Sequence, residues 1–410
     1  MDPPTINGNT KIPSSARAPR EHDTWYYPPD IADDLKDVDL PDEVKGEIFA
    51  CAWEYARCVI PHYTNWNRYI AFMRIIVMGT IVEFKGSMVD VAGGDNILGY
   101  SLSGTLAALF EGTPGHEDMA REYRSFLLVT ADKASDRRNG ELFRRYVNSL
   151  AQSPGHWFRM RDCDALARFT IAAALACNDL DDVWFSDEQF HMLGEIGVTM
   201  YDAVAFFKHR SEGETNSSFA YIPEEMRVEA FRQCREVLWA LDAAWAHQPK
   251  MQTVTNFVRI FGGPIHMMMR RYRFVEEDLT IGKPETKHVV MQTRANFKLW
   301  NRVDATKMKD VSQEEIQRYR DSVARSDELM FRGLAEFLET GGDGNCDTCR
   351  YRASYGAETT HRFGGVELCD GCRTKWGDFV ESFPERAAQV FPELVNTYNR
   401  AITTVRKAPM

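Results

Sequence analysis

The sequence predicts an all-α helical bundle that carries a small cysteine module in its C-terminal part. Apolar residues recur at helical spacing over long stretches, for example at Tyr69, Phe72, Met73 and Ile76. The alternation of apolar and polar residues that is typical of strands is scarce. Two Cys-x-x-Cys pairs follow the last long helical pattern and mark the module.

Composition changes divide the chain into three parts. Residues 1–21 are polar, contain proline and serine, and offer almost nothing apolar, so we expect a disordered tail. Residues 22–340 are expected to form the bundle. Glycines at residues 341–344 then introduce residues 341–410, which we expect to form a zinc-binding module and a C-terminal helix.

Four segments are expected to place helices within the bundle. Residues 70–84, 165–177 and 196–207 are apolar around much of the helix circumference, which is typical of helices at the centre of a bundle. Residues 314–337 have a charged face and predict one peripheral helix.

The composition indicates a globular protein with an acidic balance. Hydrophobic residues make up 44% and charged residues 27%, which excludes a chain that is disordered throughout. With 49 Lys and Arg against 60 Asp and Glu, the net charge of −11 argues against nucleic-acid binding through a generally basic surface. The sequence contains no run of 18 apolar residues and has a polar beginning, so we expect no membrane span and a cytoplasmic location.

The cysteine module has the spacing of a structural zinc site. Cys346 and Cys349 form one pair, Cys369 and Cys372 the other, and four thiolates leave no open position on a tetrahedral ion. His361 could replace one cysteine, and a redox role is disfavoured because no βαβ pattern surrounds the pairs. The arginines of the module leave a nucleic-acid-binding alternative open.

The segment 201–216 resembles the second metal-binding helix of class I terpene synthases. Asp202, Lys208 and Gly213 fall in register with that pattern, N-D-x-x-S-x-x-K-E followed by glycine. The positions that ligate Mg²⁺ in the pattern hold Tyr201, Ala205 and His209, so that magnesium site should be absent or rebuilt. The alternative is a helix that leaves the core and becomes solvated.

Other basic residues support the same resemblance. Arg271 and Tyr272 resemble the Arg-Tyr pair that grips diphosphate in these synthases, and Arg161 with Asp164 resembles their diphosphate-sensing arginine and its linked acid. The alternatives are a basic helix end and an ordinary i, i+3 ion pair. Together with Lys208, these residues would make a local anion site in an acidic chain.

Acidic residues supply the candidate magnesium ligands. Glu83 stands on the apolar segment 70–84, and Asp90 would share its face if that helix continued. Residues 178–182 look more like an aspartate-rich motif, but we interpret them as a solvated helix end. The residues around the Gly-Thr-Pro-Gly turn that could reach a pocket mouth are Glu111, His116 and Glu117.

At closer range, three stretches resemble the fungal α-ionylideneethane synthases of abscisic acid biosynthesis. They read HDTWYYPPDI at 22–31, GEIFACAWEY at 46–55 and FGGPIHMMMRRYRF at 261–274. The resemblance implies a sesquiterpene synthase that takes farnesyl diphosphate, lacks the usual aspartate-rich motifs and forms α-ionylideneethane through neutral linear hydrocarbons.

The implied reaction assigns roles to the candidate residues. Diphosphate would leave toward Arg161, Lys208, Arg271 and Tyr272 with Mg²⁺, in a dry bundle. The expected catalytic group comprises Glu83, Asp202, His209 and Lys208, with His209 or Glu83 moving protons. Two alternatives stay open, namely another isoprenoid diphosphate enzyme on the same bundle and a catalytically inactive zinc-module binding protein.

Overall fold

The computed structural model describes residues 25–206, 209, 217–220, 222, 224–269, 312–343 and 369–395, together with short strands between residues 275 and 367. Helices dominate these residues, as the sequence predicts, and every described strand is two residues long. The strands are β1 (Asn96–Ile97), β2 (Tyr100–Ser101), β3 (Val275–Glu276), β4 (Leu279–Thr280), β5 (Lys283–Pro284), β6 (Arg350–Tyr351) and β7 (Val366–Glu367).

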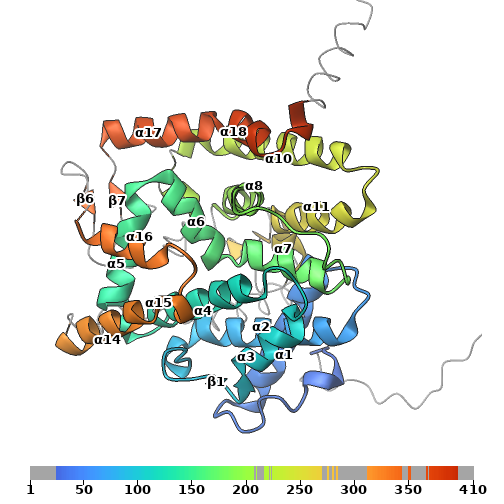
Figure 1. Cartoon of the computed structure of the whole chain (residues 1–410), viewed down its shortest axis with the longest axis vertical. Helices are drawn as coiled ribbons and strands as arrows, with labels where there is room; N and C mark the ends of the chain where they lie inside the picture. Colours follow the sequence, from blue (N-terminus) through green and yellow to red (C-terminus); the bar gives the residue numbers. More distant parts are fainter. Residues whose placement is uncertain are drawn as a thin grey trace, which may run out of the picture.

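The helices form one layered bundle (Figure 1). In chain order they are α1 (Asp42–Val59), α2 (Trp66–Phe84), α3 (Leu102–Phe110), α4 (His116–Lys133), α5 (Glu141–Gln152), α6 (Pro154–Asp164), α7 (Ala167–Ala176), α8 (Asp187–Val204), α10 (Arg227–Ala244), α11 (Pro249–Phe261), α12 (Ile265–Met268), α14 (Gln313–Ala324), α15 (Ser326–Leu329), α16 (Leu334–Asp343), α17 (Asp370–Glu381) and α18 (Phe383–Val390).

The apolar segments lie at the centre, as their composition predicts. Every residue of α7 is buried, and α2 is buried from Tyr69 to Val82 except at Arg74. Local chemistry sets where these helices begin. Asn65 caps α2 by accepting a hydrogen bond from the Arg68 amide at 3.1 Å, and Ser186 with Gln189 forms a capping box at the start of α8.

No helix among the described residues has the length and apolarity needed to cross a bilayer.

Helices α2 and α4 run side by side in the same direction. The Tyr123 hydroxyl donates to the Ile75 carbonyl at 2.6 Å, and further along the Gly86 amide donates to the Ala134 carbonyl at 3.1 Å. A Cβ at Gly86 would collide with the backbone oxygen of Ala131, so this close approach requires glycine. The C-terminal ends of α2 and α4 therefore meet at one end of the bundle.

The region after residue 312 differs from its prediction. One peripheral helix was expected over 314–337, but the chain forms α14, α15 and α16. Gly333 adopts a φ of 92°, which an L side chain rarely adopts, and it separates α15 from α16. Helix α16 runs on to Asp343, so the glycine-rich joint expected at 341–344 begins inside a helix.

The C-terminal helices share the core of the bundle. Figure 1 shows α17 and α18 lying along α10, across the end of the layer that contains α6 and α8. Trp376 of α17 is 1% exposed, and Arg386 of α18 forms a bidentate ion pair with Glu195 of α8 at 2.6 and 2.8 Å. These helices belong to the part that the sequence assigns to the zinc module, and they are packed as bundle helices.

Candidate active site

A break in an apolar helical run positions the first candidate residues. Helix α6 ends at Asp164 and α7 begins at Ala167, with Leu166 in the left-handed region at φ 52°. That conformation costs about 1–2 kcal/mol for a residue with a side chain. Asp162 offsets this cost by accepting hydrogen bonds from the Arg168 amide at 2.8 Å and from its Nε at 2.5 Å.

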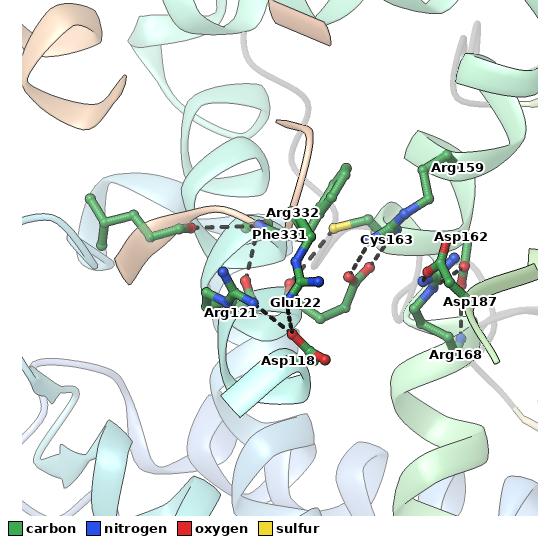
Figure 2. A network of polar contacts seen from close by, with 12 residues as sticks. Asp118, Arg121, Glu122, Arg159, Asp162, Cys163, Arg168, Asp187, Phe331 and Arg332 are labelled. Atoms are coloured by element: carbon green, nitrogen blue, oxygen red, sulfur yellow. Dashed lines mark hydrogen bonds and ion pairs between the residues drawn. The ribbon is translucent and has the colours of Figure 1, made fainter. Parts of the chain in front are cut away.

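Ion pairs on either side of the break hold α6 in place (Figure 2). Arg159 of α6 donates to both carboxylate oxygens of Glu122 on α4, at 2.6 and 2.8 Å. Arg168 reaches from α7 to Asp187 at the start of α8, at 2.5 Å. Because these contacts tie α6 and α7 to α4 and α8, the last turn of α6 has a fixed orientation.

The centre of the site is an ion pair between Arg161 on α6 and Asp202 on α8. The Arg161 Nη2 and Nε donate to the two oxygens of Asp202 at 2.8 and 3.3 Å, and Nη1 donates to Asp164 at 2.9 Å. Arg161 is 6% exposed and Asp202 is fully buried. Burial acts to lower the pKa of Arg161, but the charges of Asp202 and Asp164 outweigh it and raise that pKa, so the guanidinium stays charged.

Further groups donate hydrogen bonds to the carboxylates of Asp202 and Asp164. Ser218, in the short turn η4 (Ser218–Ala220), donates to Asp202 through its amide at 2.7 Å and its hydroxyl at 2.8 Å. Lys133 at the end of α4 forms an ion pair with Asp164 at 2.6 Å. These two cations and two anions balance one another, so a bound diphosphate would need positive charge from additional groups.

An aromatic wall lies next to the ion pair. The Tyr201 ring stacks on Phe261 with centroids 4.9 Å apart, and the rings of His266 and His209 lie 4.4 and 5.9 Å from it. The His209 Nδ1 is 3.8 Å from an Asp202 oxygen. All four rings are buried, so the site combines fixed charge with imidazole groups in a desolvated place.

Tyr201, Ala205 and His209 lie close together in the structure. The His209 amide donates to the Ala205 carbonyl at 2.8 Å, and Tyr201 and His209 face each other. Helix α8 begins at Asp187 and ends at Val204, so its C-terminal end comes before the expected residue 207. No carboxylate or amide oxygen occupies these three positions, although Mg²⁺ prefers such ligands.

The structure brings some of the predicted site residues together, and others lie outside the described residues. Arg161, Asp164, Asp202 and His209 come together although they are far apart in the sequence. Predictions that fall outside the described residues concern Lys208, Arg271, Tyr272, Cys346 and Cys349. Sequence reasoning missed Lys133, Ser218 and His266, because a lone Lys, Ser or His in a helical pattern carries no signal of its distant partner.

The helix that would have placed Glu83 and Asp90 on one face does not continue to Asp90. Helix α2 ends at Phe84, and a short 3-10 turn follows over Gly86–Met88. Asp90 is exposed, and its Oδ1 accepts the Gly93 amide at 3.2 Å. Glu83 is half-buried, and burial and then the charge of Glu83 raise the pKa of Tyr123 on α4. In the described ranges no three His, Cys, Asp or Glu gather where they could hold a metal ion.

The acidic residues 178–182 bind protein groups at the far end of α7. Asp181 holds Arg68 of α2 in a bidentate pair at 2.7 and 3.0 Å, and Asp179 accepts from Thr64 and Asn65 at 2.9 Å each. The interpretation as a helix end is confirmed, since α7 ends at Ala176. The Asp179 and Asp181 carboxylates therefore bind Arg68 of α2 and the two residues before that helix, and they are not simply solvated.

The turn with Glu111, His116 and Glu117 also lies at that far end. The Arg68 Nη2 donates to the Glu111 carbonyl at 3.0 Å, while Nη1 donates to the carbonyl of Ala176, the last residue of α7. Arg161 lies in α6, before the first residue of α7 and therefore at the opposite end of that helix. The three residues are therefore separated from the Arg161 site by the length of a helix.

A small hollow of about 10 Å³ borders Asp164 between α4, α5, α6 and α16. It is far smaller than the roughly 300–1,000 Å³ that is usual for ligand pockets, so it does not suit a long isoprenoid chain. Its lining is mostly apolar and comprises Phe126, Val129, Thr130, Tyr146, Met160, Cys163, Asp164, Phe331 and Leu334.

The family model and the relatives that match this chain carry the same description. The family model described as alpha-ionylideneethane synthase aba3 matches residues 23–393. A protein of that name from Botryotinia fuckeliana (strain B05.10) is 70% identical over 394 residues, covering 96% of this chain and 89% of that protein. Alpha-ionylideneethane synthase abl3 from Leptosphaeria maculans is 66% identical over 373 residues, covering 91% and 86%. The protein of that name from Pyricularia oryzae (strain Y34) is 55% identical over 436 residues, covering 92% and 84%.

Breaking the Arg161–Asp202 pair should strongly destabilise the folded protein. Asp202→Asn removes the charge that faces a buried guanidinium, and we expect the free energy of unfolding to fall by about 3 kcal/mol in urea titrations. Asp182→Asn is the matched control, because Asp182 is exposed and, in the described part of the chain, its ion pair is with Lys250. The control should unfold like the parent. Equal unfolding of both variants would contradict a central role for the buried pair.

Proposed function

The chain belongs to the α-ionylideneethane synthase family, and from that premise we propose that it converts farnesyl diphosphate to α-ionylideneethane and releases diphosphate. The family match over residues 23–393 carries this proposal. We propose further that the reaction passes through neutral linear hydrocarbons and serves abscisic acid biosynthesis, and that the bundle is of the class I terpene synthase type. The α6–α7 break beside Arg161, with Asp202 opposite on α8, supports that assignment.

Positive charge at the break would assist departure of the diphosphate. Carboxylates engage three of the five N–H donors of Arg161, so within the described residues two donors remain for an oxygen of the leaving group. Hydrogen bonds from a fixed cation strengthen as negative charge develops on that oxygen. Because Lys133 and the two carboxylates balance Arg161, we assign the remaining positive charge to Lys208 and Arg271, with Tyr272 as a further donor.

Neutral intermediates require a group that removes a proton and returns it. In the first step a C–H bond next to the allylic cation breaks, its electrons form a C=C bond, and the proton goes to a base. We assign this role to His209, which is buried beside Tyr201 and next to Asp202. Asp202 is saturated with donors, so its proposed role is to hold Arg161 and His209 rather than to carry the proton.

Magnesium is the proposed counter-ion of the diphosphate, and its chemical contribution would be positive charge on the leaving group. The described residues do not fit a magnesium centre, because Glu83 and Asp90 are separated by the end of α2. No step is therefore assigned to the metal.

Zinc is the proposed ion of the cysteine module. Strand β6 pairs with β7 in antiparallel register, with Arg350 opposite Glu367. In the sequence, Cys349 directly precedes Arg350 and Cys369 follows Glu367 by two residues. Cys369 is the N-cap of α17 and Cys372 lies in its first turn. The spacing of the two Cys-x-x-Cys pairs in the sequence supports the proposal of a closed four-thiolate site.

We expect about one zinc ion per chain, held by the four module cysteines. Elemental analysis of purified protein should find it, and Cys346→Ser combined with Cys372→Ser should remove it and lower solubility, because the ion contributes folding free energy. Zinc retained by the double variant would place the ion elsewhere.

Incubation with farnesyl diphosphate is the decisive experiment on function. We expect α-ionylideneethane by gas chromatography and mass spectrometry, with diphosphate released in equal amount, and a lower rate after removal of Mg²⁺. Geranylgeranyl diphosphate in a parallel reaction tests the chain length. A hydrocarbon formed only from the longer substrate would indicate another isoprenoid enzyme, and no product from either would indicate an inactive binding protein.

Restoring the magnesium ligands of terpene synthases should not improve turnover. The variant Tyr201→Asn, Ala205→Ser, His209→Glu removes the ring that stacks on Phe261 and puts new polar groups into a buried place. We expect at least a 10²-fold lower rate because the proposed proton carrier is lost. Rate and product measured at several Mg²⁺ concentrations check this. A faster triple variant with the same product would show that the alignment of this segment is wrong.

A further inference from the structure

Helix α17 contacts α6 about one helical turn before Arg161. Trp376 lies with its ring centroid 6.4 Å from Trp157 and 6.4 Å from Phe158, and Phe379 stacks on Phe158 at 5.6 Å. Trp157 and Trp376 are both 1% exposed, so this contact is part of the core. Its position in sequence is notable, because α17 starts at the second Cys-x-x-Cys pair of the module.

From Trp157 a chain of hydrogen bonds leads to the ion pair. The indole Nε1 donates to the Ser218 hydroxyl oxygen at 3.2 Å, and that hydroxyl donates to Asp202 at 2.8 Å. An indole N–H can only donate, so the Ser218 oxygen must accept from it and direct its own hydrogen to Asp202. Trp157 thus fixes the orientation of the hydroxyl that completes the Asp202 carboxylate.

Helix α17 also contacts the chain a few residues after Ser218. Arg373 of α17 pairs with Glu225 in η5 (Glu224–Met226) at 3.2 Å. Ser218 therefore lies in the sequence between Trp157 on α6 and Glu225 in η5, and both of these residues contact α17. Displacement of α17 would loosen Ser218 from both sides.

We propose that α17 supports the candidate active site through Trp376, Trp157 and Ser218, and that Trp157 is a positioning residue for Asp202 and Arg161. The cysteine module then acts on the chemistry without touching substrate, because its second pair begins the helix that holds Trp157. The kinetic part of this proposal rests on the proposed function, whereas its structural part does not.

The test compares two buried tryptophans that both face the C-terminal helices. Trp157→Phe keeps an aromatic ring but deletes the donor to Ser218. Trp245→Phe is the matched control, because Trp245 donates to Glu393 at 2.8 Å and contacts Phe391 at 5.6 Å, with no described contact to Asp202. A third variant, Trp376→Leu, keeps an apolar side chain but deletes the ring that contacts Trp157 and Phe158, so it should loosen Ser218 as Trp157→Phe does.

Hydrogen exchange of the Ser218 amide, which donates to Asp202, is the first measurement. We expect about tenfold faster exchange in Trp157→Phe and no change at Ser218 in Trp245→Phe. The second measurement is turnover of farnesyl diphosphate, where kcat should fall about tenfold with KM nearly unchanged, since the bond supports a charge used in the transition state.

Unchanged exchange at Ser218 in Trp157→Phe would overturn the proposal, and so would an equal loss in Trp245→Phe. A parent protein that does not consume farnesyl diphosphate would refute the proposed function alone, because the exchange experiment would still decide whether Trp157 holds Asp202 in place.

Discussion

A buried arginine must keep its charge, and the structure around α6 is arranged to satisfy this requirement. Removing the Arg161 guanidinium from water would be prohibitively costly without opposite charges in good geometry. Asp202 and Asp164 supply those charges from two directions. The requirement accounts for the carboxylate that α8 carries deep in the core, opposite Arg161. Ser218 and Lys133 then add donors to the oxygens of Asp202 and Asp164.

The same rule applies to the other buried charges near the break. Arg159 is paired with Glu122, Arg168 with Asp162, and Arg386 with Glu195, each through a short contact. Such pairs contribute little net stability compared with apolar packing, but each one fixes the orientation of the helix that carries it. For a reaction that develops charge, fixed dipoles and cations are more effective than mobile ones, because they need no reorganisation at the moment of reaction.

The C-terminal helices are part of this arrangement rather than an appendage. Trp376 fills the core against α6, and Arg386 neutralises Glu195 within α8. A small cysteine-rich segment cannot build a large core of its own, and a metal ion would compensate for that deficit. Once α17 and α18 are packed, the module and the bundle stabilise each other, which gives the zinc proposal a structural purpose separate from chemistry.

The sequence by itself determined the all-α class, the central helices and the family, because helical periodicity and long distinctive stretches are local properties. It also identified the i, i+3 pair of Arg161 and Asp164, whose geometry follows from one helix. Only the tertiary structure decided the partners of those residues. Arg161 meets Asp202 across 41 positions and Arg68 meets Asp181 across 113, separations that no local period encodes. The end of α2 at Phe84, which separates Asp90 from Glu83, was likewise decided by the approach of Gly86 to α4.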